Sequence, residues 1–210
     1  DRMTDNVIIA IGRQCGSGGH EIGMRLAKKL DIPLYDHNLV AMAAKELDIS
    51  EEAAREVDET ALSSFLASYI TGPGDYVAYM NAEDYMRPLS ERVYKAQSGI
   101  IRRLAGRSPC VIVGRCADYV LQDCPNCVSV FICADKEDRI KRIAQLQELP
   151  ERKAAEKIKK IDRERKYYYE TNTGEDWGKA SSYQLVLNVS RLGLNKSVDI
   201  LASLFESLGQ

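Results

Sequence analysis

Four glycines stand within eight residues near the start of the chain, in the stretch 12–19. An apolar, β-branched run over 7–11 precedes them, and Ile22, Leu26 and Leu30 follow at the spacing of one helix face. Because glycine lacks a Cβ, a loop between such a strand and helix can turn consecutive N–H groups toward one point, where the helix adds partial positive charge. The pattern predicts an anion site, and phosphate is the anion we expect there.

We expect backbone N–H groups of the loop and the first helical turn to hold the phosphate, at Gly16, Ser17, Gly18, Gly19 and His20. The loop departs from the strict pattern G-x-x-x-x-G-K-[ST], because Arg13 stands at the first glycine and Gly19 at the lysine. A plain strand-to-helix turn without a ligand is the alternative. A dinucleotide-binding turn is disfavoured, since no second strand ending in a ribose-binding acid follows at the expected distance.

The missing lysine is the mobile charge that spans the β- and γ-phosphates in such loops. Arg13 lies in the same loop, and we predict that its long side chain folds back over the phosphates to supply this charge. The alternative is that Arg13 pairs with a surface acid. Glu21 follows in the first helical turn and is predicted to hold Mg²⁺, which takes carboxylate oxygen readily.

Two further strands end in residues that suit an acceptor. Pro33 predicts an edge position for its short strand, which has Asp36 at its carboxyl end. The apolar run 110–113 leads to Arg115, and Asp118 lies three residues further on. Ligands of open parallel sheets collect beyond the carboxyl ends of strands, so Asp36, Arg115 and Asp118 are predicted to bind the acceptor.

Both strand ends have alternative interpretations. Asp36 could instead contact Mg²⁺ or cap the helix predicted over 38–47. Arg115 could form a structural ion pair, although its planar guanidinium suits bidentate recognition of phosphate or carboxylate better.

Basic residues gather between positions 139 and 166, where eleven Lys or Arg stand against five Asp or Glu. We predict a mobile lid over the phosphates, in which arginines reach the developing charge of phosphoryl transfer. The candidate arginines are Arg142, Arg152, Arg163 and Arg165. A solvated helical face and a nucleic-acid surface are the alternatives. No aromatic residue stands between positions 139 and 166, which weakens the interpretation as a surface on which bases stack.

The composition is that of an ordinary soluble protein, with 45% apolar residues, 29% charged residues and a formal charge of −2 over 210 residues. No apolar run approaches a membrane span, and the first residues lack the apolar centre of a signal peptide, so we expect a cytoplasmic protein. Six cysteines, mostly in apolar surroundings, indicate buried thiols. Cys124 and Cys127 form a lone C-x-x-C, for which a metal or redox role is disfavoured because no partner motif exists.

Strand patterns alternate with helix patterns, which predicts an α/β fold with a parallel five-stranded sheet and helices on both faces. The predicted strands cover 7–11, 32–37, 110–115, 128–133 and 183–189, and a closing helix covers 196–208. We expect one domain over 1–210, with a core of about 7–48 and 105–210. A helical, acceptor-binding insertion is expected at about 49–104 and a lid at about 148–170.

The chain resembles the cytidylate-kinase-like family of phosphate-loop proteins, relatives of the nucleoside monophosphate kinases. Four blocks carry the resemblance over about residues 7–190: the strand and glycine loop at 9–19, Val113-Gly114-Arg115, the helix start at 134–147, and the lid at 158–165. The resemblance implies a phosphate-loop fold, ATP at the glycine loop, an acceptor such as CMP at the Gly-Arg block, and lid arginines at the transferred phosphoryl group.

The chain departs from this family at several functional positions. Gly19 replaces the lysine, Glu21 is taken to occupy the hydroxyl position that meets Mg²⁺, and Cys116 replaces the aspartate of Gly-Arg-Asp. In the lid, Ile161 and Tyr168 stand where two arginines are expected. Each change removes charge or donors from the phosphoryl site.

The resulting prediction is ATP-dependent phosphoryl transfer to a small acceptor, most simply a nucleoside monophosphate, with Mg²⁺ and with Arg13, Arg142, Arg163 and Arg165 as catalytic residues. A nucleotide-binding regulatory protein without transfer is the alternative, and a nucleic-acid-binding protein is less favoured. The expected partners are a nucleotide and a small-molecule acceptor, without a membrane, and a homodimer is compatible with the sequence.

Overall fold

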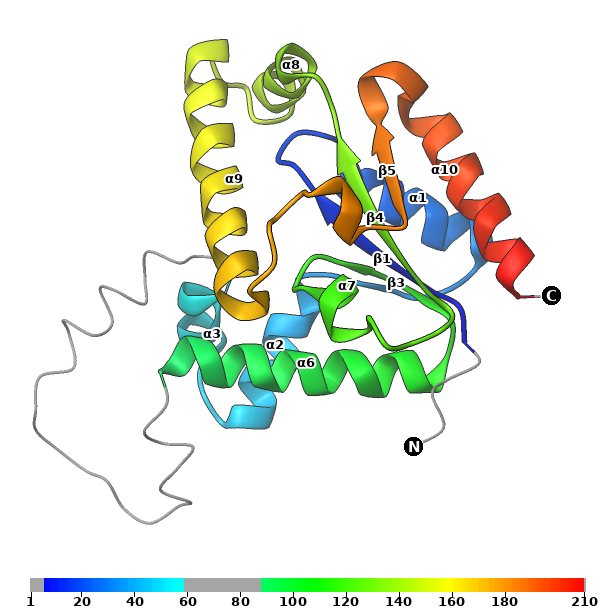
Figure 1. Cartoon of the computed structure of the whole chain (residues 1–210). Coiled ribbons are helices and arrows are strands. Elements are labelled where there is room, and N and C mark those ends of the chain that lie inside the picture. Colours follow the sequence, from blue (N-terminus) through cyan, green and yellow to red (C-terminus); the bar gives the residue numbers. More distant parts are fainter. Residues whose placement is uncertain (1–5, 59–87, 210) are drawn as a thin grey trace, which may run out of the picture.

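The computed structural model describes residues 6–58 and 88–209. Its strands form one parallel sheet in the order β2-β3-β1-β4-β5. The strands are β1 (Ile8–Arg13), β2 (Leu34–Tyr35), β3 (Cys110–Val113), β4 (Cys127–Cys133) and β5 (Leu185–Asn188). The predicted α/β fold with a parallel five-stranded sheet is therefore confirmed (Figure 1).

β1 lies at the centre of the sheet because its residues are apolar on both faces. Ile9 pairs with Val111 on one side and Val128 on the other, and all three side chains are buried. At the edge, Pro33 directly precedes β2, and its carbonyl oxygen accepts from the N–H of Val111 at 2.9 Å. Proline has no N–H to donate, and at this position none is needed by the sheet. The edge position predicted from Pro33 is correct.

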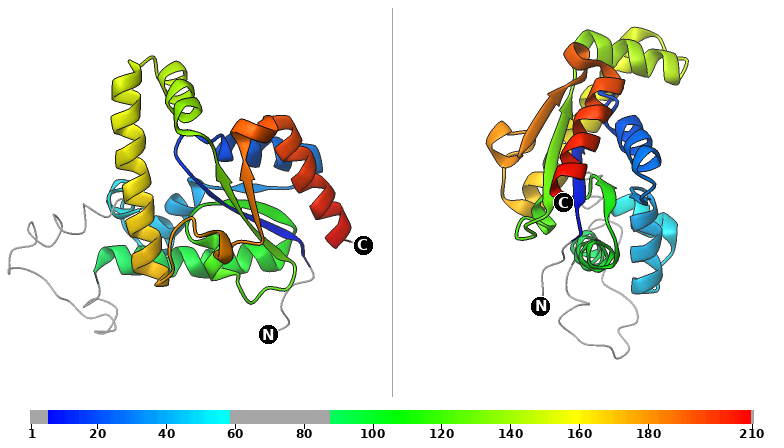
Figure 2. Two further views of the ribbon diagram at one scale, coloured as in Figure 1. Left: turned by 45° about the horizontal axis from the view of Figure 1, so that its top comes forward. Right: turned by 90° about the vertical axis from the view of Figure 1, so that its right-hand side faces the viewer.

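Helices cover both faces of the sheet, as predicted (Figures 1 and 2). α1 (Gly19–Leu30) and α10 (Val189–Leu208) pack against one face, around Ile9 and Ile11. α2 (Asn38–Leu47), α6 (Leu89–Arg107) and the short α7 (Ala117–Val120) pack against the other, around Ile8 and Ala10. α3 (Glu51–Val57) joins α2 and α6 in a smaller apolar cluster.

Two helices stand beyond the carboxyl ends of the strands, α8 (Lys136–Leu146) and α9 (Glu151–Thr173). Figure 1 shows α9 along the carboxyl edge of the sheet, opposite the edge near which both chain ends lie. Ile143 of α8 packs on Ala154 and Ile158 of α9, and a short 3-10 helix, η1 (Ala180–Ser182), leads from α9 to β5. The basic stretch that was predicted to be a lid is therefore a helical pair beside the glycine loop.

Several predicted boundaries differ from the structure. α10 begins at Val189 rather than at 196, and Gly193 interrupts it with φ 77° and ψ 164°. Of the helical insertion expected at about 49–104, the structure describes α3 as far as Val57 and α6 from Leu89, and the stretch 59–87 lies outside the described residues. His37, and not Asp36, precedes the first helical residue of α2, so the capping alternative for Asp36 is wrong.

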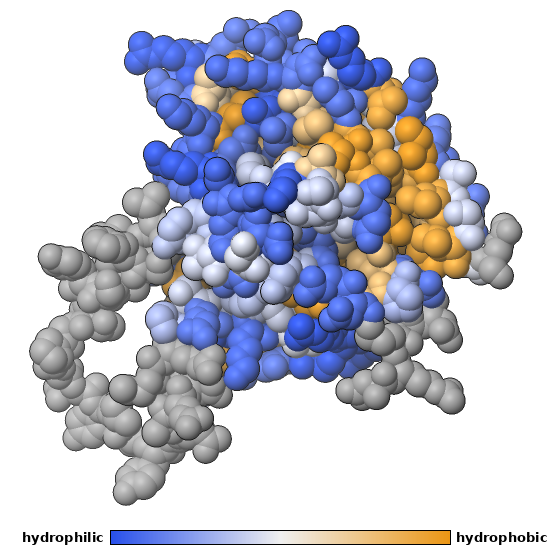
Figure 3. Space-filling view, in the orientation of Figure 1, coloured by the Kyte–Doolittle hydropathy of each residue, from blue (hydrophilic) through white to orange (hydrophobic). Residues whose placement is uncertain are grey.

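The surface carries an apolar area over β5 and α10 (Figure 3). Val186 and Ile200 keep 39% and 38% of their surfaces exposed. Within the described ranges, no helix is both long and apolar enough to cross a membrane. All six cysteines are free thiols, and Cys124 and Cys133 are the two that are only partly buried. The homodimer with which the sequence is compatible is not tested by this structure.

Candidate active site

The loop between β1 and α1 has the conformation that its glycines predicted. Gly16 and Gly18 adopt φ angles of 75° and 88°, which residues with a Cβ rarely adopt. A Cβ at Gly16 would lie 2.8 Å from the carbonyl oxygen of Arg139 in α8, so a larger residue would push the two elements apart. Ser17 Oγ donates to the Gln14 carbonyl at 2.8 Å and tightens the turn. The stretch 16–20 thereby runs directly into the N-terminus of α1, which suits a phosphate group.

Arg13 is the last residue of β1 and is buried beneath this loop, with 6% of its surface exposed. A Cβ built at Gly19 would lie 2.5 Å from Arg13 Cβ and 3.0 Å from Arg13 Cγ. Side chains at these two positions therefore exclude each other. The base of the Arg13 side chain therefore lies next to the position from which the lysine is missing.

α8 and α9 are docked onto the loop at Cys15. The N–H of Cys15 donates to Asp162 Oδ1 at 2.7 Å, and Arg139 Nη1 bonds both the Cys15 carbonyl at 3.2 Å and Asp162 Oδ2 at 2.5 Å. The Cys15 thiol packs against Ile143 and Ile158, and its burial raises its pKa above the ordinary value for a thiol. α8, α9 and the glycine loop thus form one connected unit.

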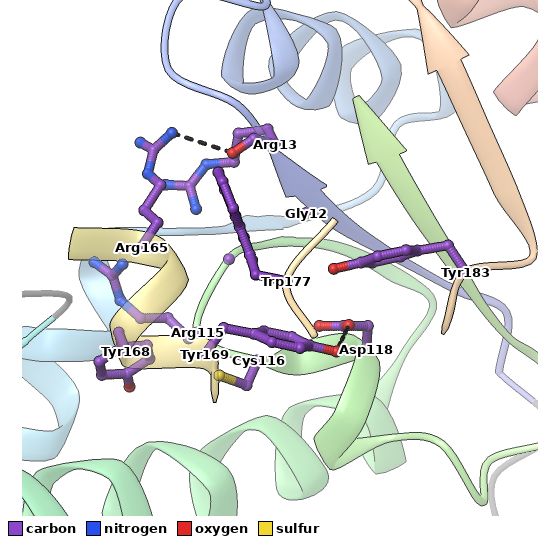
Figure 4. Close-up of a pocket in the computed structure, with 11 residues that line it drawn as sticks. Gly12, Arg13, Arg115, Cys116, Asp118, Arg165, Tyr168, Tyr169, Trp177 and Tyr183 are labelled. Carbon is purple, nitrogen blue, oxygen red and sulfur yellow. Dashed lines mark hydrogen bonds between the residues drawn. The ribbon is translucent and has the colours of Figure 1, made fainter. Parts of the chain in front are cut away.

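A narrow hollow lies beside the loop, between Gly12 at the end of β1 and Gly114 at the end of β3. Figure 4 shows the side chains that surround it, and besides Cys116 and Asp118 they form two groups. The first group is the three arginines Arg13, Arg115 and Arg165, and the second is the four aromatic residues Tyr168, Tyr169, Trp177 and Tyr183. They leave about 20 Å³ between them, room for about one water molecule, so a larger molecule enters only when they part.

Asp118 brings a carboxylate to the floor of the hollow, in α7. Its Oδ2 accepts from the hydroxyl of Tyr169 at 2.7 Å. Burial raises the pKa of Asp118, while the hydrogen bond from Tyr169 acts in the opposite direction. Burial also raises the pKa values of Tyr169 and Tyr183, so both phenols stay protonated at neutral pH.

Comparison with known proteins agrees with this geometry. A family model described as the cytidylate kinase-like family matches residues 8–191. The chain belongs to the cytidylate kinase-like family. This confirms the resemblance that the sequence blocks predicted. No match was found among curated protein sequences.

Solved structures resemble this cytidylate kinase-like chain over nearly its whole length. An uncharacterized protein from Eubacterium ventriosum ATCC 27560 is 27% identical, with a TM-score of 0.71 over 96% of this chain and 99% of that one. Shikimate kinase from Bacteroides thetaiotaomicron is 16% identical, with a TM-score of 0.52 over 95% and 98%. A gluconokinase from Sinorhizobium meliloti 1021 is 15% identical, with a TM-score of 0.50 over 99% and 95%. The last two establish the phosphate-loop kinase fold.

Arg115 follows β3 in a left-handed turn. The φ angles of Gly114, Arg115 and Cys116 are 76°, 57° and 53°, a conformation that costs roughly 1–2 kcal/mol for each residue with a Cβ. Arg115 Nη2 lies 2.8 Å from Asp58 Oδ2, and both side chains are buried. The ion pair considered from the sequence therefore exists, but it lies at the carboxyl edge of the sheet, and the arginine also lines the hollow.

Asp36 follows a strand and Glu21 lies in the first turn of α1, as predicted, but their contacts were not foreseen. Asp36 follows β2, next to β3, but it does not line the hollow; its Oδ2 lies 2.6 Å from His20 Nδ1. Glu21 bonds Arg25 at 2.5 Å and Arg142 at 3.1 Å. The residue directly after Gly19 is His20, so His20 and not Glu21 stands at the hydroxyl position of the strict pattern.

These contacts decide which carboxylate of the cytidylate kinase-like site fits Mg²⁺. The described ranges contain no group of three or more His, Cys, Asp or Glu that could hold a metal ion. Magnesium needs fewer protein ligands, because one or two carboxylates, substrate phosphates and water suffice. Asp36 is buried, and its Oδ2 lies 2.6 Å from His20 Nδ1 and 3.6 Å from His37 Nε2, whereas Glu21 is engaged by two permanently charged arginines. Asp36 therefore fits Mg²⁺ better than Glu21 does.

The predicted lid arginines separate into two sets. Arg165 Nη1 donates to the Arg13 carbonyl at 3.3 Å, and Arg142 lies beside Gly18, where its Nη1 would be 3.4 Å from an added Cβ. Arg163 is exposed on α9 and does not line the hollow, and Arg152 is 90% exposed and pairs with Glu156. Two positions along a helix correspond to about 200° of rotation, so Arg163 and Arg165 cannot face the same side.

Other residues of the site were not singled out by sequence reasoning. They are Asp58, Gln97, Tyr168, Trp177 and Tyr183. Two signals were present: the run Tyr167-Tyr168-Tyr169 and the single tryptophan of the chain. The tyrosine run does not show its partners in the sequence, because Tyr168 bonds Gln97 of α6, 71 residues away, and Gln97 in turn bonds Asp58, which follows α3.

Proposed function

We propose that this cytidylate kinase-like protein transfers the γ-phosphoryl group of ATP to a small acceptor, most simply a nucleoside monophosphate such as CMP. The glycine loop at 16–20 would hold the ATP phosphates, and the hollow next to it would hold the acceptor. Family membership and the kinase fold support phosphoryl transfer in general. The choice of acceptor rests on the chemistry of the hollow.

The single observation that carries this choice is the combination of arginines and aromatic rings. Arg13, Arg115 and Arg165 suit the phosphate of a monophosphate, because planar guanidinium groups bind phosphate oxygens in pairs. Trp177 and the tyrosines offer flat faces for a base. A sugar acid or polyol acceptor has no aromatic ring to stack, which favours a nucleotide over such acceptors.

The base of ATP has a candidate position on the other side of the loop. A groove beside Gly16 is bounded by Arg142 and Leu146 of α8 and by Val189 and Ser190 at the start of α10. Leu146 is 72% exposed there and gives the groove an apolar side chain. A base between Arg142 and these residues would leave its phosphates near Gly16.

The residues present also fit Mg²⁺. Asp36 would hold the ion, with His20 bonded to the same carboxylate. When bound, Mg²⁺ neutralises charge on the phosphate oxygens. Arg13, Arg142 and Arg165 would then stabilise the charge that develops on the transferred group, and α9 would exclude water from it. We also propose the division expected from the sequence, with an acceptor-binding insertion at about 49–104 and a lid at about 148–170.

The test is a screen for ADP release from ATP and Mg²⁺ with CMP, UMP, AMP, GMP, shikimate or gluconate as acceptor. We expect a nucleoside monophosphate to raise ADP release well above hydrolysis without acceptor, with the phosphorylated product visible by mass spectrometry. Turnover of gluconate or shikimate alone would contradict the nucleotide acceptor. Since ATP is the donor, a cytoplasmic location is part of the proposal.

A nucleotide-binding regulator without transfer is the second candidate, and one observation favours it. Asp162 of α9 already accepts from the N–H of Cys15, so a carboxylate stands at the loop of a site that lacks its lysine. If calorimetry shows that ATP binds but no acceptor gives ADP release, the regulator is the correct function. A nucleic-acid surface is less favoured, because Arg139 and Arg142 are already paired with Asp162 and Glu21.

A further inference from the structure

Four buried side chains form a continuous chain of polar contacts behind the hollow, which we name the Arg115–Tyr168 chain. Arg115 Nη2 lies 2.8 Å from Asp58 Oδ2, and Asp58 Oδ1 accepts from Gln97 Nε2 at 2.8 Å. Gln97 Oε1 in turn accepts from the Tyr168 hydroxyl at 3.1 Å. None of the four exceeds 8% exposure, and Gln97 is fully buried.

The chemistry of these groups fixes the direction of every contact. An ionised carboxylate only accepts, so Gln97 must turn its NH₂ toward Asp58 and its oxygen toward Tyr168, whose hydroxyl then donates. Both ends of the chain therefore donate toward Asp58. A side chain with different donors and acceptors at position 97 would break one of the two contacts and leave a buried polar group unsatisfied.

The chain connects four elements that are distant in sequence. Arg115 follows β3, Asp58 follows α3, Gln97 lies in the middle of α6, and Tyr168 lies near the end of α9. Both ends reach the hollow, since Arg115 and Tyr168 are among its lining residues (Figure 4). The acceptor side of the site and the lid helix are thus joined through buried contacts.

The backbone at Arg115 has a conformation that needs such support. Arg115 and Cys116 are both left-handed, which a residue with a Cβ keeps only where its surroundings hold it. The ion pair with Asp58 fixes the side chain of Arg115 at this strained turn. An arginine that is held before its ligand arrives loses less rotamer freedom on binding, and its donors are already in position.

We propose that Asp58 and Gln97 are positioning residues for the acceptor. Asp58 holds the guanidinium of Arg115 at the hollow, and Gln97 connects that pair to Tyr168, so that binding of the acceptor's anionic group and docking of α9 stabilise each other. The inference rests on the proposed function, in which Arg115 contacts the acceptor. Neither positioning residue touches the reacting atoms.

The experiment compares Asp58→Asn and Tyr168→Phe with wild type, using ATP and CMP. Ser197→Ala is the matched control, because Ser197 is also fully buried and donates one hydrogen bond, to the Gly193 carbonyl at 2.8 Å in α10. Initial rates give KM for CMP and kcat, and calorimetry gives the Kd of ATP. Trp177 lines the hollow and is the single tryptophan, so acrylamide quenching of its fluorescence reports on the docking of α9 without turnover.

We expect Asp58→Asn to raise KM for CMP about 10- to 100-fold. The Kd of ATP should change less than about twofold, since the Arg115–Tyr168 chain does not reach the glycine loop. Tyr168→Phe should raise KM for CMP by less than Asp58→Asn does, because acceptor binding and docking of α9 are coupled, and it should lower kcat on the order of tenfold and increase Trp177 quenching. Asp58→Asn should add little in an Arg115→Lys background, because the two residues act together. Ser197→Ala should lower Tm and leave KM, kcat and Trp177 quenching unchanged.

If Asp58→Asn does not fold, Tyr168→Phe decides, because it removes one hydroxyl and no charge. Unchanged kcat and unchanged Trp177 quenching in Tyr168→Phe would overturn the proposal, as would an equal response in Ser197→Ala. If wild type transfers phosphate to no acceptor, the proposed function fails separately. Quenching of Trp177 without ligands then tests whether the Arg115–Asp58 pair is coupled to the docking of α9. A rise in quenching confined to Asp58→Asn and Tyr168→Phe supports the coupling, and equal quenching in all proteins refutes it.

Discussion

Arg13 and Gly19 exclude each other's side chains, since a Cβ at position 19 would lie 2.5 Å from Arg13 Cβ. In the strict phosphate-loop pattern the first of these positions is glycine and the second is lysine. Here the small residue and the long cation have exchanged places. One cation thus remains next to the first turn of α1, supplied from the end of β1.

The first prediction follows from this exchange. Arg13→Ala should lower kcat about a hundred- to thousandfold, because losing one preorganised charge at a transferring group typically costs about 2.7–4 kcal/mol. ATP should still bind, with a moderately higher Kd, because the backbone N–H groups of 16–20 remain. Steady-state rates and calorimetry measure the two effects. Wild-type rates in Arg13→Ala would show that the charge comes from elsewhere.

The second prediction concerns the exchange itself. Gly19→Lys alone should destabilise the fold by about 1–3 kcal/mol, because the new side chain collides with Arg13. Arg13→Gly combined with Gly19→Lys removes the collision and restores the strict pattern, so stability should recover relative to Gly19→Lys alone, and the rate should recover relative to Arg13→Gly alone. Urea unfolding and ADP release give these values. A single Gly19→Lys variant as stable as wild type would contradict the exclusion.

Much of the fold was predictable because its signals are local. Apolar runs rich in Val and Ile marked β1, β3 and β4, and Pro33 marked the edge next to β2. The glycine loop and Arg115 were found for the same reason. Asp58, Gln97 and Tyr168 could not be found, because their partners lie 39 and 71 residues away and meet only when α3, α6 and α9 pack. Arg163 was grouped with Arg165 because sequence proximity was read without the helical rotation between them.

The third prediction tests the loop as a phosphate cradle. Gly18→Val should abolish ATP binding, because Gly18 has φ 88° and a Cβ there would lie 2.7 Å from Leu194 and 3.4 Å from Arg142. Gly174→Ala is the matched control: its φ is also positive, at 73°, but no atom lies within 4 Å of an added Cβ. Both variants should lose some stability, and calorimetry should show ATP binding lost only in the first. Equal ATP affinity in the two variants would contradict the cradle.

The fourth prediction separates the two neighbouring lid arginines. Arg165→Ala should lower kcat about a hundred- to thousandfold, because Arg165 lines the hollow and bonds the Arg13 carbonyl. Arg163→Ala should change kcat less than about twofold, since Arg163 is exposed on another side of α9. Parallel rate measurements at saturating ATP test both. An equal loss in the two variants would mean that α9 turns or moves before transfer.

The last prediction uses the burial of Asp118. Burial raises its folded-state pKa above 3.8, so the carboxyl group contributes most stability below pH 3.8, where it is protonated in both states. That contribution is lost as the pH rises through the folded-state pKa. Asp118→Asn keeps an oxygen that can accept from the Tyr169 hydroxyl and removes the charge. The variant should therefore match wild type near pH 3 and be more stable than wild type at pH 7.

Urea unfolding between pH 3 and pH 8 measures this difference, which can change by at most about 1.4 kcal/mol per pH unit. Asp123→Asn is the control, because Asp123 is exposed and its carboxylate keeps its water in the folded state. A stability difference between wild type and Asp118→Asn that is constant with pH would mean that the bond from Tyr169 fully offsets the desolvation. In that case Asp118 is ionised without penalty, and the hollow presents a stable negative charge to the acceptor.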